Sequence, residues 1–228
     1  MTYSLAQGIS FGMIGSDAVV LDLTADRYLR LTGARVETLE HLARSNTARS
    51  SGTADGLVAA GILTRDRGEP VLPIEAPVVV TSILERSLYA EAAQHSSQVS
   101  IEKLPAFEVI SARVIAGSWM RIAGLSGTVD RWRDLRSRLA PGRVDAAAAA
   151  TKISQDYAGA RSLLPVQRRC VPDSLALIGC LWRRGIPAEL FFGVRLAPFA
   201  AHAWVQTGTL LLSDPLDSVA EFTPVFRL

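Results

Sequence analysis

The sequence predicts an α+β protein made of two parts, and three observations lead to this expectation. Short strand patterns, two helices and a closing strand fill residues 1–66. Residues 105–228 begin with helical periodicity and end with strand-like segments. Between these parts, residues 66–80 contain three prolines, which is typical of a linker. We therefore expect one domain over 1–66, a connecting segment over 67–104, and a second domain over 105–228.

The first part has the element order of a winged helix-turn-helix domain. Its expected elements are strands at 18–23 and 27–31, a helix at 34–44, a helix that ends before Gly61, and a short last strand. Helical spacing places these apolar side chains toward the core: Val36, Leu39, Leu42, Leu57, Val58 and Ala60.

Winged helix-turn-helix domains usually bind DNA, so the charge of this part is informative. Residues 1–70 contain seven arginines and no lysine against eight acidic residues, a net charge of −1. Because DNA affinity comes largely from neutralising phosphates, we expect no nucleic-acid partner.

The composition of the whole chain indicates in which cellular compartment the protein is expected. The 228 residues carry a net charge of +2 and only two cysteines, which fits free thiols in a reducing environment. The N-terminal residues lack a basic stretch followed by an apolar run, and no stretch approaches ~18 uninterrupted apolar residues. We expect a cytoplasmic protein with no membrane association.

The second part reads as helices followed by an antiparallel sheet. The expected helices lie at 107–123, 129–139, 144–164 and 174–184, and the expected strands at 188–196, 201–206 and 209–214.

Cys170 lies just upstream of the first turn of the fourth of these helices. Pro172 suits a first helical turn, and Gly185 ends the helix. Unpaired N–H groups and the helix dipole at such a position favour a thiolate. Cys180 lies roughly 15 Å further along the helix, too far for a disulfide, which needs Cα atoms within about 7 Å. The alternative is that Cys170 is an inert, buried apolar side chain.

Only one of the three histidines has the setting of a general base. We expect His41 and His95 at the surface, whereas His202 lies in an apolar strand, where alternation places it on one face with Trp204 and Gln206. A hairpin around Gly208 whose paired residue numbers sum to 416, or to 414, puts Asp214 on that same face. An odd sum would separate His202 and Asp214, and Asp214 could also simply end a strand.

Cys170, His202 and Asp214 are together the parts of a cysteine hydrolase. The thiolate attacks a carbonyl, the imidazole transfers the proton, and the carboxylate orients the imidazole. Backbone N–H groups at the helix start could bind the oxyanion, with Gln167 as a candidate side-chain donor. Asp173 would oppose thiolate formation locally. Two thiols ten residues apart lack the spacing of a zinc site, so we expect no metal and no cofactor.

Four segments of this part resemble a known family. They are CVPDSLAL from Cys170, WRRGIPAELFFGV from Trp182, FAAHAWVQ from Phe199 and LLSD from Leu211. They are similar to the transglutaminase-like cysteine peptidases of lasso peptide biosynthesis, the B proteins. The resemblance implies a papain-like fold with Cys170 as nucleophile, His202 as base and Asp214 as orienting acid.

The first part resembles the PqqD-like domain that is fused to this peptidase in some gene clusters. The similar segments are VVLDLTADRYLRLTGARVETLEHL from Val19 and LVAAGIL from Leu57. The resemblance implies that this domain binds the leader of a ribosomal precursor peptide as an added strand. By position, the contacting residues would be Arg27, Tyr28, Leu29, Arg30, Leu57 and Val58.

The implied function is that of a leader peptidase. It would hydrolyse the bond between leader and core, and so free the core's amine for an ATP-dependent, asparagine-synthetase-like lasso cyclase partner. Two alternatives remain. One is an acyltransferase of the transglutaminase type with the same triad, and the other is a non-catalytic winged-helix protein that binds peptides or acts as a regulator.

Overall fold

The computed structural model describes residues 2–45, 52–83, 103–139 and 146–228. The chain forms two compact units. The first contains Met1–Ala76 together with residues 193–201 and 223–227, and the second contains Pro77–Phe192, residues 202–222 and Leu228. The predicted boundaries at 66 and 105 divide the chain into consecutive stretches. The compact units are not consecutive, because residues 193–201 and 223–227 belong to the first unit.

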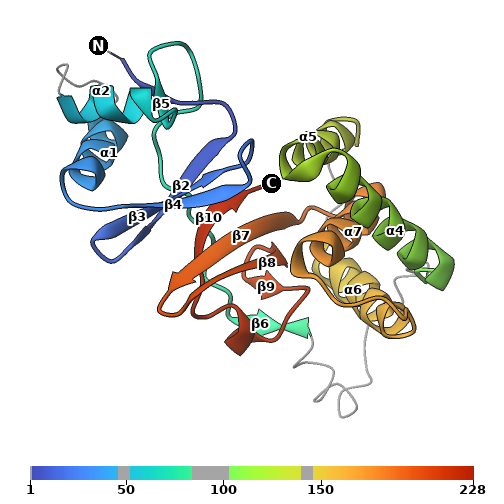
Figure 1. The fold of residues 1–228 in the computed structure, drawn as a ribbon. Coiled ribbons are helices and arrows are strands. Elements are labelled where there is room, and N and C mark those ends of the chain that lie inside the picture. The colour runs from blue at the N-terminus through green and yellow to red at the C-terminus, as the bar shows by residue number, and fades with distance from the viewer. Residues whose placement is uncertain (1, 46–51, 84–102, 140–145) are drawn as a thin grey trace. The chain divides into compact units, whose positions relative to one another are not determined.

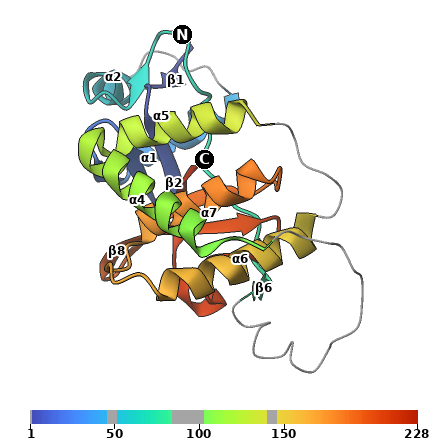
Figure 2. The ribbon, with the colours of Figure 1, turned by 90° about the vertical axis from the view of Figure 1, so that its right-hand side faces the viewer.

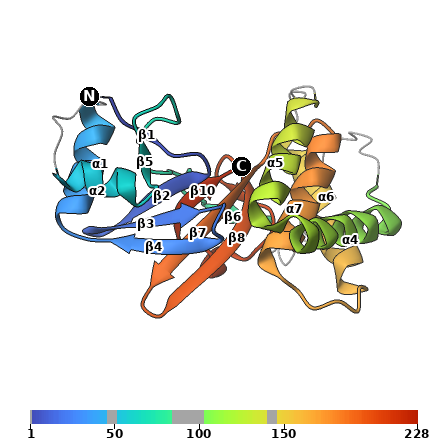
Figure 3. The same ribbon diagram turned by 45° about the horizontal axis from the view of Figure 1, so that its top comes forward.

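The first unit combines two small sheets with two helices (Figure 3). Its elements are β1 (Ser4–Leu5), β2 (Ile9–Ile14), β3 (Asp17–Asp22), β4 (Arg27–Leu31), α1 (Ala34–Ser45), α2 (Gly52–Ala59) and β5 (Leu63–Thr64). Strands β2, β3 and β4 form an antiparallel sheet in that order, so β4 lies at one edge, and β1 pairs with β5. The sequence patterns did not reveal β2.

The core of the first unit confirms most of the predicted apolar faces. Val36, Leu39, Leu42 and Leu57 are all buried in one cluster, with Val58 packed against it. The prediction for Ala60 was wrong: α2 ends at Ala59, so the helical spacing no longer applies and Ala60 is exposed.

Two features of the first unit come from segments outside residues 1–66. Val71, in the segment predicted as a linker, is buried in the same core. Gly12 of β2 meets β10 (Thr223–Arg227), where a Cβ would collide with the carbonyl group of Pro224. Because this contact involves backbone, only glycine fits at position 12.

In the described part of the chain, four helices of the second unit pack on one another. They are α4 (Ala106–Ile122), α5 (Gly124–Ser137), α6 (Ala146–Ser162) and α7 (Cys170–Arg183). Helix α7 contacts each of the other three, and α4 also contacts α5 and α6 (Figure 2). Its central position explains why α7 is buried on nearly all sides from Ser174 to Trp182. None of the helices in the described part of the chain is long and apolar enough to cross a membrane.

The larger sheet has the order β10-β7-β8-β9-β6, with β7 at Glu189–Leu196, β8 at Phe199–Thr207, β9 at Leu210–Leu211 and β6 at Thr81–Ser82 (Figure 1). A short 3-10 helix spans Leu216–Ser218. The prediction of a purely antiparallel sheet was wrong, because β6 pairs with β9 in parallel. Strand β6 directly follows the proline-containing segment 66–80 and is far from β9 in the sequence, so no hairpin connects the two strands.

The predicted register of the β8–β9 hairpin was also wrong. Gln206 pairs with Leu211 and Thr207 with Leu210, so the paired numbers sum to 417. The loop is a two-residue turn of Gly208 and Thr209, in which Gly208 has a φ of 54°. Two-residue hairpin turns require positive φ, and glycine adopts it readily.

Candidate active site

Cys170 is the first residue of α7, whereas the sequence placed it just before the first turn. Arg169 before it is extended, and Pro172 occupies the first turn as predicted. Ser174 lies one turn further along and is buried, and its hydroxyl donates a hydrogen bond of 3.0 Å to the Ala203 carbonyl oxygen. This bond fixes the start of α7 against the strand that carries His202.

His202 lies on β8 between two aromatic rings. Its ring stacks near Trp204 at 6.4 Å and contacts Phe222 at 5.4 Å between centroids. The contact with Trp204, and the hydrogen bond of 2.8 Å from Trp204 to Gln206, confirm that these three side chains share a face. The imidazole therefore has a restricted orientation and a half-buried setting.

Asp214 reaches His202 although the hairpin register is odd. The carboxylate Oδ1 lies 3.2 Å from Nε2 of His202, but the N–H direction misses it, so the contact is an ion pair without an aligned hydrogen bond. Strand β9 ends at Leu211, so strict alternation no longer applies at Asp214. Catalytic contacts of this kind are often loose before substrate binds.

Two hydroxyl groups hold Asp214 in place. Ser213 donates a 2.5 Å hydrogen bond to the Asp214 carboxylate, while its oxygen accepts the Val205 N–H. The buried Ser82 of β6 donates to the backbone carbonyl oxygen of Asp214 at 2.6 Å. Sequence reasoning missed both serines. Ser213 could have been suspected only because it directly precedes the candidate acid in the sequence. Nothing in the sequence indicated Ser82, which lies 132 residues from Asp214.

The thiol of Cys170 and the imidazole of His202 lie within hydrogen-bond reach of each other and shift each other's pKa. Burial alone raises the pKa of Cys170, but the bond to His202 and backbone hydrogen bonds from Ala203 and Val171 bring it below its ordinary value. Burial likewise lowers the pKa of His202, but Asp214 and Cys170 together raise it to about 9. Each shift favours the charged form, so a thiolate–imidazolium pair is stabilised.

The three side chains line one cavity of about 310 Å³. One face of α6 forms a wall with Ser154, Tyr157, Ala158 and Arg161, and Leu177 and Leu212 add apolar surface. A cavity of this size, with a few polar groups on a partly apolar surface, is typical of a small-molecule or peptide subsite. A nucleophile, a base and an acid in such a cavity can carry out acyl transfer or hydrolysis.

The other predicted site residues lie elsewhere. Gln167 is exposed and is not among the residues that line this cavity; its backbone carbonyl accepts a hydrogen bond from Arg161. His41 is exposed as expected, and His95 lies outside the described residues. In the described part of the chain, no group of three or more His, Cys, Asp or Glu side chains could hold a metal ion.

The residues predicted to bind a leader all lie in the first unit. Arg27, Tyr28, Leu29 and Arg30 are on the edge strand β4, where Asp22 and Asp17 of β3 pair with the two arginines. Tyr28 packs edge-on against Phe199 at 5.8 Å between centroids. Leu57 is only 1% exposed, so its side chain belongs to the core, and Val58 is half-buried.

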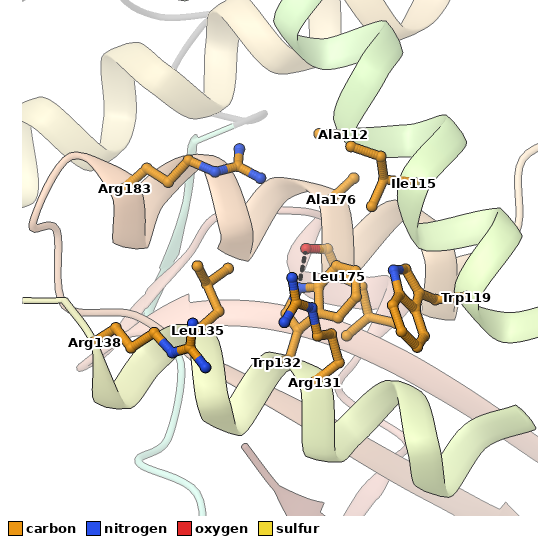
Figure 4. Close-up of a pocket in the computed structure, with 10 residues that line it drawn as sticks. All are labelled: Ala112, Ile115, Trp119, Arg131, Trp132, Leu135, Arg138, Leu175, Ala176 and Arg183. Atoms are coloured by element: carbon orange, nitrogen blue, oxygen red, sulfur yellow. Dashed lines mark hydrogen bonds between the residues drawn. The ribbon is translucent and has the colours of Figure 1, made fainter. Parts of the chain in front are cut away.

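A second cavity, of about 270 Å³, lies between α4, α5 and α7 (Figure 4). Trp119, Trp132 and Leu135 line it together with Arg131, Arg138 and Arg183. The Trp132 ring is fixed by a 2.8 Å hydrogen bond from its Nε1 to the Leu175 carbonyl oxygen, drawn as a dashed line. Among the described residues that line it there is no cysteine and no histidine, so the triad cavity is the candidate site for thiol chemistry.

A sequence profile of the Transglutaminase-like superfamily matches residues 114–227, which is half of the 228-residue chain. The chain belongs to this superfamily. The matched region includes Cys170, His202 and Asp214, together with α7, β8 and β9, but not β6, whose Ser82 binds the backbone of Asp214. No curated protein and no solved structure matches the chain. A transglutaminase-like domain with these residues in one cavity suggests a thiol enzyme.

Proposed function

We propose that this protein is the leader peptidase of a lasso peptide pathway. In this proposal the second unit cleaves the bond between leader and core of a ribosomal precursor peptide, and the first unit binds the leader. The observation that carries the catalytic part is the shared cavity, in which a thiol and an imidazole favour each other's charged form and the imidazole lies 3.2 Å from a carboxylate. The lasso assignment rests on the resemblance of the four segments from Cys170 to Asp214.

The chemistry follows from the arrangement of the triad. The Cys170 thiolate attacks the scissile carbonyl carbon, and backbone N–H groups at the start of α7 stabilise the oxyanion. Protonated His202 gives its proton to the leaving amine nitrogen, which breaks the peptide bond and leaves a thioester on Cys170. Neutral His202 then takes a proton from water, which attacks the thioester, and the leader leaves with a free carboxylate. Asp214 holds the imidazole in orientation throughout.

The leader-binding part of the proposal is supported by the position of β4. This strand is at the edge of the β2-β3-β4 sheet, where a peptide can add as a further strand through main-chain hydrogen bonds. Asp22 and Asp17 pair with its two arginines, so recognition would rely on backbone groups and on Tyr28 and Leu29 more than on charge.

Mass spectrometry of the reaction products tests the catalytic part. The protein is mixed with a synthetic precursor peptide and the cyclase in water enriched in ¹⁸O. Hydrolysis predicts a free leader with one ¹⁸O in its new terminal carboxylate. Intact precursor under all conditions would contradict the proposal.

An acyltransferase would give a different product in the same experiment. With a primary amine such as glycinamide present, transfer predicts a leader ending in an amide and carrying no ¹⁸O. A protein that only binds peptide would retain the precursor uncleaved. These outcomes separate the peptidase from both alternatives.

Proline substitutions test leader binding through the edge of β4. Adjacent strand residues direct their N–H groups to opposite sides, so Tyr28→Pro and Leu29→Pro remove N–H groups from different sides of β4. The variant that keeps the ladder with β3 should retain its melting temperature and lose leader binding about tenfold or more, as measured by fluorescence polarisation of a labelled leader. Unchanged binding in the variant that stays folded would contradict strand addition.

A further inference from the structure

A buried ion cluster lies beside the start of α7. Arg113 and Arg161 are 6% and 3% exposed, and both donate from Nε to Oδ1 of Asp173, at 2.5 and 2.7 Å. Two guanidinium groups thus share one carboxylate, so the negative charge of Asp173 is paired with two positive charges. Burying charged groups carries a desolvation penalty that can cancel the attraction between them, so what else this cluster binds bears on its role.

The two arginines differ in what else they bind. Arg161 also donates from a terminal nitrogen to the carbonyl oxygens of Val166 at 3.0 Å and Gln167 at 3.2 Å. In the described part of the chain, Arg113 donates a hydrogen bond to Asp173 and to no other residue. Arg161 therefore connects the carboxylate to the loop that leads into Cys170, and Arg113 does not.

Asp173 completes the connection from the other side of Cys170. Its Oδ2 accepts the backbone N–H of Arg169 at 2.9 Å, and Tyr157 donates to its backbone carbonyl oxygen at 3.0 Å. Helix starts leave N–H groups without partners, and the N-cap residue Arg169 has no side-chain cap. The Asp173 carboxylate reaches back to the N–H of Arg169, as the N3 side chain does in a capping box, although Asp173 lies one position later.

We propose that Arg161 and Asp173 are positioning residues that clamp the chain on both sides of Cys170 and so hold its thiol against His202. The clamp, defined as these two side chains, ties residues 166, 167 and 169 to residue 173. Loosening it would let the thiol move away from the imidazole. The inference deepens the proposed function, but it requires only that Cys170 and His202 form a reactive pair.

Glutamine substitutions separate positioning from stability. Arg161→Gln and Arg113→Gln each remove one positive charge and leave a one-to-one ion pair with Asp173. The two variants are matched in charge and chemistry, and only the first removes the arginine that binds the loop. If the cluster were only structural, both would lose similar stability and similar reactivity.

The measurement is the rate of alkylation of Cys170 by iodoacetamide as a function of pH, with Cys180→Ala as the background. In Arg161→Gln we expect the rate at pH 7 to fall about tenfold or more and its pH midpoint to rise, because the thiolate loses its imidazolium partner. In Arg113→Gln we expect at most about a threefold loss and the same midpoint. The other titratable or charged side chains lining the cavity are Tyr157, Arg168, Asp173, His202 and Asp214.

Equal effects in the two variants, or an unchanged midpoint in Arg161→Gln, would overturn the clamp. If Arg161→Gln does not fold, the comparison moves to Arg161→Lys and Arg113→Lys. Lysine keeps the charge but cannot bind the carboxylate and two carbonyl groups together, so the same difference is expected. Alkylation needs no peptide, so failure to cleave a precursor would count against the proposed function and leave the clamp standing.

Discussion

The two ends of α7 carry the only two cysteines of the chain, and their thiols behave in opposite ways. Cys170 begins the helix at a cavity beside His202, and its pKa is lowered. Cys180, ten residues later, is fully buried, and burial raises its pKa to about 11. On the same helix, the thiol of Cys170 is therefore activated, whereas the thiol of Cys180 is not.

Burial does not explain this difference, because burial raises the pKa of both thiols. What Cys170 has and Cys180 lacks is an imidazole within hydrogen-bond reach, whose charged form a carboxylate supports. A partner brought from another element thus decides which cysteine is reactive. The following predictions test this contrast.

Cys170→Ala should abolish precursor cleavage, since no other thiol can reach the carbonyl carbon. Leader binding should stay within a few-fold, because the proposed binding strand is in the first unit. Mass spectrometry gives the cleavage and fluorescence polarisation the binding. Normal cleavage by this variant would remove Cys170 as nucleophile.

Iodoacetamide at pH 7 should modify Cys170 at least about 100-fold faster than Cys180. With a pKa of about 11, roughly one Cys180 thiol in 10⁴ is ionised at that pH, whereas the imidazole of His202 lowers the pKa of Cys170, so a far larger share of that thiol is ionised. Peptide mapping of the alkylated protein measures both rates. Comparable labelling of the two cysteines would show that the contrast is absent in solution.

Asp214→Asn should lower turnover between about 10- and 10³-fold, because the amide cannot support the imidazolium and allows the wrong tautomer. A thiol needs less help from its base than a hydroxyl, so the loss should be smaller than in serine enzymes. Asp217→Asn, an exposed acid three residues away, is the matched control and should have full turnover. Full turnover in Asp214→Asn would reduce the site to a Cys–His dyad.

The pH profile should respond to the same substitution. Asp214 helps to raise the pKa of His202 to about 9, so the alkaline limb of kcat/KM should lie near pH 9 and move to lower pH in Asp214→Asn. Because the folded-state pKa of His202 exceeds its ordinary value of 6.5, its stabilising contribution is complete below about pH 6.5 and is lost as pH rises through 9. An unshifted limb would mean that Asp214 does not act on His202.

Cys180→Ala should have the smallest effect. The substitution removes a buried thiol from the core and should cost about 1 kcal/mol of unfolding free energy, with turnover within about twofold of the parent. Chemical denaturation and the cleavage assay measure the two quantities. A large loss of turnover without a loss of stability would give Cys180 a role that its setting does not explain.

Local patterns in the sequence were sufficient for most of the helices and for the neighbourhood of two site residues, whereas α5 begins at Gly124, five residues before its predicted start. Helical spacing placed α1, α4, α6 and α7 within a few residues, and Pro172 and Gly185 located the ends of α7. Strand alternation placed His202, Trp204 and Gln206 on one face. These features depend on residues within a few positions of one another, which is the range over which backbone periodicity acts.

Strand alternation could not predict the position of the Asp214 side chain. The expected even register was wrong, and an odd register should have separated acid from base. The two still meet, because the chain leaves the strand after Leu211 and hydroxyl groups hold the carboxylate. Alternation describes a continuous strand and says nothing about the residues just beyond its end.

By itself, the sequence determined the α+β order of elements, the helix that begins at Cys170, and the one histidine set within a strand. Only the tertiary structure decided which groups meet. Ser82 reaches Asp214 across 132 residues, and Arg113 reaches Asp173 across 60. Such contacts come from the packing of the helices and the sheet as a whole. The pKa of a thiol depends on burial and on the charges around it, and both are fixed only when distant segments come together.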